Sequence, residues 1–342
     1  MWEELSKDNR PSYGGQAVIE GVMMRGPGHM ALSVRDPEGN IVSLTGKVEN
    51  LSEQNKVTRL PVIRGAVSLF ESLSLGIQML MKSAEIAAPE EEKPSDNALT
   101  LAVAFAVVMG LGLFVILPSY VTAWFVRYLA VSGRYWVSFI ESALRLLFLI
   151  AYVVSISRMK DIQRVLEYHG AEHKVIWAYE KNYSDLEGLL TGGSTRDIQS
   201  RQCSRENQAD AGSLEHCVEF LVEKAKPESP LHPRCGTSFL FIAVLVTWIV
   251  FLFMSPKSLI VRIVARIAML PVVAGLAYEV LRRSAKGEGF LWGLVKAPGI
   301  AMQRLTTREP DKGQLEVAAT SLVLLIIEES NPGAHMNSTT GF

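Results

Sequence analysis

The chain has 342 residues, of which 49% are hydrophobic, and its mean hydropathy of +0.20 exceeds that of an ordinary soluble domain, so a membrane protein is the first class to consider. The formal net charge of −1 gives no bulk attraction to nucleic acid or to acidic lipid, so nucleic acid is not an expected partner. Residues 1–10 are polar and lack the apolar core of a signal peptide.

Residues 1–97 are expected to form a cytoplasmic β-rich region followed by an interfacial helix. The glycines and alternating apolar residues of Gly14–Pro27 predict short strands, and Ala31–Val34 with Ile41–Leu44 predicts a hairpin around a turn rich in Pro, Gly and Asn. The glycines match neither a phosphate loop nor a dinucleotide-binding fingerprint. Three polar side chains of this region either line a site or belong to an exposed strand face: Gln16, Glu20 and Arg25.

The apolar period becomes helical after Pro61 and stays so for roughly twenty residues. Such a helix can lie on the inner leaflet or pack under the spanning helices, and the sequence leaves both placements open. The run Pro89–Asp96 is typical of an exposed linker.

Four apolar runs are each about long enough to cross a hydrocarbon core: Leu99–Leu117, Tyr135–Ile156, Phe239–Met254 and Leu259–Leu281. We therefore expect a membrane α-helical fold with four transmembrane helices, within residues 98–157 and 237–283, and a cytoplasmic α+β portion of short strands and amphipathic helices. Basic residues follow the second and fourth runs, and such residues tend to stay in the cytoplasm. Both termini and residues 158–236 are accordingly expected on the cytoplasmic side.

Four charged residues interrupt the apolar runs: Glu141, Arg145, Arg266 and Glu279. A charge near the bilayer centre costs about 3 kcal/mol or more, so these side chains are expected to face the protein interior or a wet cavity. One interpretation is a structural cluster in which Glu141 pairs with Arg145 or Arg266, and the other is a functional polar cavity.

A motif that can bind a metal ion lies in the segment 165–180, which is expected to be helical. This places His169 and His173 one turn apart on one face and Glu172 on the neighbouring stripe. Two imidazoles so spaced can hold one ion, and a nearby carboxylate can take a proton from water that the ion activates. The order His-x-x-Glu-His is the inverted form of a zinc-hydrolase helix motif. An interfacial helix with solvated imidazoles is the alternative.

A second metal-competent pair, His232 and Cys235, lies at the end of the segment 158–236. Pro233 and Gly236 predict a tight turn that presents both side chains. The cysteines would lie in a reducing compartment, where a disulfide is not expected. Three further residues match no metal-binding spacing and are expected to be isolated: Cys203, His216 and Cys217.

The polar segment 181–230 is expected to be an insertion in which Gly192–Thr195 and Gln202–Gly212 are flexible and Ser213–Lys226 is a helix. Residues 284–330 predict cytoplasmic helices, among them an amphipathic one at Leu315–Glu328 that is too short to span, and residues 331–342 predict a disordered tail.

Six stretches together resemble the YqhQ-like bacterial membrane proteins of domain of unknown function 1385: Gly14–Pro27, Arg64–Gly76, Tyr168–Lys174, His232–Phe239, Tyr278–Leu281 and Gln303–Asp311. The resemblance covers most of the chain. Members are described as predicted metal-dependent enzymes, so the resemblance implies a metal ion at His169, His173 and His232-Pro233-Arg234-Cys235 without indicating a reaction. This chain differs from the family in the long polar stretch between His173 and His232.

We therefore expect a multi-pass protein of the bacterial inner membrane that binds a divalent metal ion, zinc, at the cytoplasmic face and catalyses hydrolysis. The expected metal ligands are His169 and His173 with either His232 or Cys235, and the expected catalytic residues are Glu172 as general base with Arg234 or Arg308 as the anion-stabilising group. The alternatives are a membrane scaffold or transport accessory with a structural four-ligand site, and a transporter with a polar pathway through the charged helices. The lipid bilayer is the expected partner, and a homo-oligomer or a second membrane protein stays open.

Overall fold

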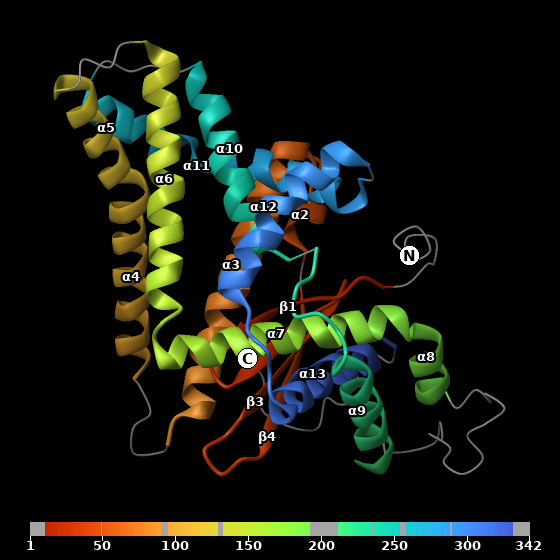
Figure 1. The fold of residues 1–342 in the computed structure, drawn as a ribbon. Coiled ribbons are helices and arrows are strands. Elements are labelled where there is room, and N and C mark those ends of the chain that lie inside the picture. The colour runs from red at the N-terminus through yellow and green to blue at the C-terminus, as the bar shows by residue number, and fades with distance from the viewer. Residues whose placement is uncertain are drawn as a thin grey trace.

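The computed structural model describes residues 11–48, 50–89, 95–128, 133–191, 211–233, 235–253, 258–287 and 289–330. Long helices gather at one end of the molecule, and a small sheet with further helices forms the other end (Figure 1). The bundle contains α4 (Asp96–Leu111), the π-helix η2 (Gly112–Ile116), α5 (Leu117–Tyr128), α6 (Arg134–Ile156), α10 (Thr237–Leu252) and α11 (Leu259–Lys286). Two more helices pack against the bundle, α3 (Pro61–Ala87) and α12 (Phe290–Thr306), and the short helix α2 (Leu51–Gln54) packs against α3.

One antiparallel sheet accounts for the predicted N-terminal strands. It contains β1 (Gly14–Val18), β2 (Gly21–Arg25), β3 (His29–Arg35) and β4 (Ile41–Lys47), paired in chain order. The predicted hairpin is confirmed, since Val34 pairs with Val42 across β3 and β4. The Asp36 carboxylate closes its turn by accepting a hydrogen bond from the Asn40 backbone N–H at 2.7 Å. Gly39 supplies the left-handed backbone that the turn needs, with φ of +92°.

Different helices cover the two faces of this sheet. The helices α7 (Lys160–Lys181), α9 (Ala211–Ala225) and α13 (Lys312–Ser330) form the core on the face of Met24 and Ala31, whereas α3 covers the other face with Met79. Between Gly313 and Glu329 no residue of α13 is exposed. The predicted amphipathic C-terminal helix is instead buried over most of its surface, because α13 lies between the sheet, α7 and α9 and keeps only a narrow, partly exposed stripe that includes Glu316 and Thr320.

The helix expected at Ser213–Lys226 is present as α9, and α8 (Tyr183–Thr191) precedes it. This helix belongs to the core, because Cys217 and Leu221 are buried against α7 and α13. Cys203 and the predicted tail lie outside the described residues.

The helix predicted after Pro61 packs along the bundle. Gly65 and Gly275 lie at the crossing of α3 and α11, where a Cβ atom on Gly65 would come within 2.6 Å of the Gly275 carbonyl oxygen. Arg64 pairs with Glu279 at 2.7 Å, so this predicted intramembrane carboxylate has a partner from α3. Of the two placements that the sequence left open, the structure has α3 against the bundle.

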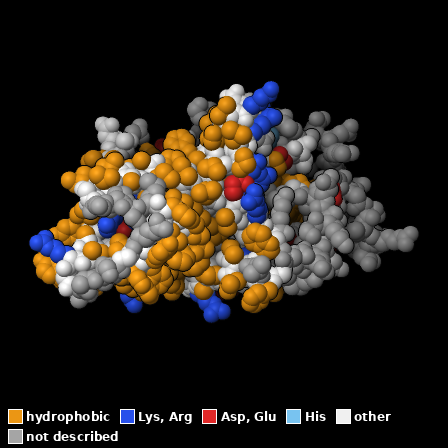
Figure 2. Space-filling view, turned by 90° about the horizontal axis from the view of Figure 1, so that it is seen from above, with side chains coloured by type: hydrophobic (Ala, Val, Ile, Leu, Met, Phe, Trp, Pro, Cys, Tyr) orange, Lys and Arg blue, Asp and Glu red, His pale blue; other side chains and the backbone are white. Residues whose placement is uncertain are grey.

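Three helices among the described residues are long and apolar enough to cross a membrane: Asn97–Tyr128, Tyr135–Ile156 and Leu259–Ser284. The first continues through η2 and is longer than the predicted run Leu99–Leu117. The helix expected as a fourth span, α10, has 16 residues, fewer than the roughly 20 that a span needs. The described structure thus supports three spanning helices. Hydrophobic side chains cover much of the bundle when it is viewed from above (Figure 2).

Candidate metal centre

The candidate site is built on α7, which is enclosed by the sheet, α9 and α13. Every residue from Gly170 to Glu180 is buried. At Gly170 the segment after α12 lies directly across the helix, since a Cβ atom there would overlap the carbonyl oxygen of Arg308. The Arg308 N–H also donates to the Leu166 carbonyl at 3.0 Å. These contacts fix α7 in place, so the direction of its side chains is fixed as well.

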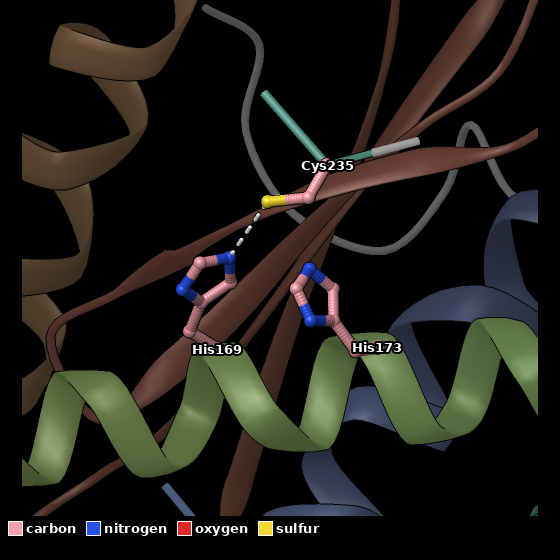
Figure 3. A group of neighbouring side chains, drawn as sticks. All are labelled: His169, His173 and Cys235. Atoms are coloured by element: carbon pink, nitrogen blue, oxygen red, sulfur yellow. Dashed lines mark hydrogen bonds between the residues drawn. The ribbon is translucent and has the colours of Figure 1, made fainter. Parts of the chain in front are cut away.

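Three side chains with metal-binding atoms converge above α7. A ring nitrogen of His169, a ring nitrogen of His173 and the sulfur of Cys235 all lie within 4.8 Å of one another. Both rings point from α7 toward Cys235, which comes from the turn before α10 (Figure 3). The sequence offered either His232 or Cys235 as the third ligand, and the structure brings Cys235 to this position.

Backbone carbonyls orient both imidazoles. His169 Nδ1 lies 2.6 Å from the Thr306 carbonyl oxygen, and His173 Nδ1 lies 2.6 Å from that of Pro230. Each Nδ1 must therefore carry the proton, which leaves Nε2 with its lone pair free to bind a metal ion. His173 is 1% exposed and its Nε2 has no hydrogen-bond partner among the described residues. Backbone acceptors leave no trace in a sequence, so neither carbonyl could be predicted.

Glu172 faces the same space, as its place in the motif predicts. One of its carboxylate oxygens lies 3.9 Å from His169 Nε2 and 3.8 Å from His173 Nε2. The residue is buried. A side chain at Gly15 of β1 would collide with it, so a glycine is required where this strand passes over the carboxylate. The carboxylate is placed to bind an ion directly or to take a proton from water beside it.

His232 lies next to the group without joining it. Its ring centroid is 5.8 Å from that of His173, and its Nε2 is 3.5 Å from a carboxylate oxygen of Glu180. Burial lowers the pKa of His232 to about 4, against a smaller opposing effect of the Glu172 carboxylate, so the ring is neutral near pH 7. The Gln303 side chain holds this turn by accepting from the His232 N–H and donating to the His232 carbonyl, both at 2.8 Å.

The Cys235 sulfur accepts further hydrogen bonds at the start of α10. The Thr237 hydroxyl donates to it at 3.4 Å and the Thr237 N–H at 3.5 Å. The sulfur also lies 3.3 Å from His169 Nε2. The thiolate is the form of a cysteine that binds metal ions. The role of Thr237 was not predicted.

A cavity of about 400 Å³ opens onto these residues. Its walls are α7, the backbone of β1 and the turn before α10. Of the three polar residues proposed to line a site in the N-terminal region, Gln16 lies in this wall. Glu20 instead bonds to Arg164 and Tyr168, and Arg25 bonds to Ser72 at 3.2 Å.

Of the two predicted anion-stabilising arginines, only Arg308 lies among the described residues, and it is not in the cavity wall. The Arg308 guanidinium donates to the Ser157 carbonyl at the end of α6, at 3.1 Å, and is thus not brought to the site. Its backbone, rather than its charge, contacts α7. Arg234 lies outside the described residues.

Comparison with known proteins confirms the resemblance and supplies no reaction. The family described as "Protein of unknown function (DUF1385)" matches residues 60–188 and 212–327, and the chain belongs to this family. It is 29% identical over 326 residues to "Uncharacterized protein YqhQ" of Bacillus subtilis (strain 168), with 91% of each chain covered. No solved structure matches. Between its two matched parts the family model leaves out residues 189–211. The polar stretch in which this chain differs from the family is therefore shorter than the whole interval from His173 to His232.

Proposed function

We propose that this member of a family without an assigned reaction is a metal-dependent hydrolase whose site lies where the bundle meets the sheet domain. The observation that carries the proposal is the convergence of two imidazole nitrogens, one cysteine sulfur and one carboxylate on a single cavity. Two oriented histidines with a third ligand form the usual protein shell of a catalytic zinc site.

The side chains fit a divalent ion of the zinc type. The unpartnered, buried Nε2 of His173 costs free energy unless something binds it, and the thiol of Cys235 favours a soft or borderline metal. When bound, such an ion acts as a Lewis acid and lowers the pKa of water. His169, His173 and Cys235 would hold it, and the Thr306 and Pro230 carbonyls would keep the two rings in the binding tautomer.

In the proposed reaction Glu172 is the general base. Its carboxylate is within reach of a water molecule placed between the two imidazoles, from which it would take a proton and later pass it to the leaving group. Gln16 and the β1 backbone form the wall opposite α7, where substrate would bind. Arg234, next to Cys235 in the chain, keeps its predicted role of stabilising negative charge on the substrate.

The second candidate is a structural site in a non-enzymatic membrane scaffold or transport accessory. It is favoured by the short distance from Glu172 to both rings, because a carboxylate so close can serve as a fourth ligand and close the coordination sphere. His232 is a less suitable fourth ligand, because its Nε2 lies beside Glu180 and its ring makes an edge-to-face contact with Trp177.

X-ray absorption on the zinc-loaded protein separates the two candidates. A catalytic site predicts two nitrogen ligands, one sulfur ligand and one oxygen ligand. The oxygen ligand should remain after Glu172→Gln, because in a catalytic site it belongs to a water molecule. In a structural site that oxygen belongs to Glu172, so Glu172→Gln should remove the oxygen ligand or the ion itself. A zinc-free protein after purification in the presence of zinc would contradict both candidates.

We further propose that the protein lies in the bacterial inner membrane with both termini and the sheet domain in the cytoplasm. This orientation needs an even number of crossings, so the proposal includes the shorter apolar helix α10 as a fourth crossing between the second and third long spans. Basic residues at the ends of the second and third long spans support this orientation: Arg158 and Lys160 follow the second, and Arg282 and Arg283 lie in the last turn of the third. The exposed apolar side chains of the bundle are suited to contact with lipid, so we propose the lipid bilayer as the partner of this surface. A second copy of the chain or another membrane protein can cover part of the same surface.

Cysteines introduced at Glu38 and Glu219 are expected to react with a membrane-impermeant maleimide only after the cells are opened, because both positions are exposed on the sheet domain. A cysteine at Tyr135, at the other end of α6, is expected to react in intact cells. The unmodified chain measures the background from its own cysteines. Reaction of Glu219→Cys in intact cells would reverse the proposed orientation.

A further inference from the structure

The interior of the spanning bundle contains a three-residue charge cluster. Glu141 of α6 is fully buried and accepts hydrogen bonds from Arg145 at 2.8 Å and from Arg266 of α11. The Ser119 hydroxyl donates to the same carboxylate at 2.6 Å. The sequence predicted that Glu141 pairs with one arginine or the other, whereas the structure pairs it with both.

This cluster carries an excess positive charge. It combines one carboxylate with two guanidinium groups, and Arg145 and Arg266 are only 8% and 6% exposed. The one other carboxylate in the three candidate spans is Glu279, which pairs with Arg64. An uncompensated charge inside a membrane bundle costs several kcal/mol. The described residues of the spans provide no further anion to balance it.

Several donors of the cluster also lack acceptors. Arg145 Nη1, Arg266 Nε and Nη1, and the Thr122 hydroxyl are buried and have no hydrogen-bond partner among the described residues. Thr122 lies one turn after Ser119 on the buried stripe of α5. Native proteins leave few such groups unsatisfied, so unpartnered donors beside excess positive charge indicate a bound acceptor that is negatively charged.

The guanidinium groups are held in place independently of any ligand. Arg145 Nε donates to the Phe114 carbonyl at 3.1 Å, and Phe114 lies in η2, where the wider π-helical turn alters the backbone hydrogen bonds. The Arg266 guanidinium lies over the Phe251 ring at 4.3 Å. The remaining N–H groups are therefore directed by contacts with three neighbouring elements and need not reorganise to bind.

We propose that the bundle binds a small inorganic anion, such as chloride or phosphate, between Arg145 and Arg266. Glu141 is seven residues from the start of α6 (141 − 134) and Arg266 is seven from the start of α11 (266 − 259), so each lies about 10 Å along its helix. Both helices begin at the end of the bundle away from the sheet (Figure 1). The anion thus enters from the side opposite to the candidate metal centre, and the site does not depend on the proposed hydrolase.

The test measures thermal unfolding in detergent at constant ionic strength, with sodium gluconate replaced stepwise by sodium chloride or sodium phosphate. The wild-type midpoint is expected to rise and saturate. In Arg266→Met, which leaves a neutral Glu141–Arg145 pair, the apparent affinity is expected to fall by about tenfold or more. Arg282→Met removes an exposed arginine of the same helix and is expected to behave as wild type.

Two outcomes would overturn the proposal: a salt dependence that does not saturate, or the same saturable dependence in Arg266→Met as in wild type. Ion chromatography of wild-type protein exchanged into gluconate gives a second readout if Arg266→Met does not fold, and loss of all chloride and phosphate would also count against the site. Phosphatidylglycerol is the competing source of an anionic group, so stabilisation by that lipid and by neither salt would contradict an inorganic anion.

Discussion

Replacing His169 or His173 with alanine is expected to abolish zinc binding. Each change removes a nitrogen whose tautomer is fixed by a backbone carbonyl, and two ligands cannot replace a three-ligand shell. The loss in affinity should exceed the roughly 10- to 100-fold that removal of an outer hydrogen-bond partner costs. Cys235→Ser is expected to have the same effect, since a hydroxyl is a poor substitute for a thiolate. Elemental analysis of the purified variants measures the bound ion.

The Glu172→Gln variant tests whether Glu172 acts as a general base or as a metal ligand. It keeps the size of the side chain and removes its charge, so the ion should stay while hydrolytic turnover or complementation in the cell falls by about a hundredfold or more. His216→Ala is the matched control, because this half-buried histidine lies on α9 outside the cavity wall and should retain both zinc and function. Zinc lost with Glu172→Gln would make the carboxylate a ligand. Full zinc content in both histidine variants would end the metal hypothesis.

The sequence predicted the part of the site that lies within one helix. His169 and His173 share one face and Glu172 lies on the neighbouring stripe because the helical period is fixed, and no tertiary information is needed to see it. The choice between His232 and Cys235 could not be made in the same way, because it depends on how a turn some sixty residues away packs against α7. Its packing depends on Gln303, a buried amide whose role has no local sequence signal.

Hydrophobicity alone was also insufficient for two helices. The run Phe239–Met254 predicted a fourth span, but α10 has only 16 residues and packs against α6, α11 and α12, so the fourth span stays a prediction. The polar residues of α13 suggested a solvent face, but Gln314 bonds to Glu167 of α7 and Ser321 bonds to the Ala31 carbonyl of β3. Polar groups satisfied inside a core look the same in a sequence as polar groups in water.

Gly170→Ala is expected to damage both the fold and the candidate site. The new methyl group would overlap the Arg308 carbonyl, and because the obstructing atom belongs to the backbone it cannot move aside by a side-chain rotation. Overpacking of this kind costs about 1–3 kcal/mol or more, which outweighs the gain of up to about 1 kcal/mol from replacing a helical glycine. Thermal unfolding of the purified variant measures the net loss.

The same substitution should weaken zinc binding without touching a ligand. Arg308 follows Thr306 by two residues, and the Thr306 carbonyl orients His169, so displacement of this segment from α7 also releases the ring. Gly293→Ala on α12 is the control, because an added Cβ meets nothing there and helix propensity alone should leave stability unchanged or slightly raised. A Gly170→Ala protein as stable and as zinc-loaded as Gly293→Ala would show that the segment after α12 does not hold His169 in place.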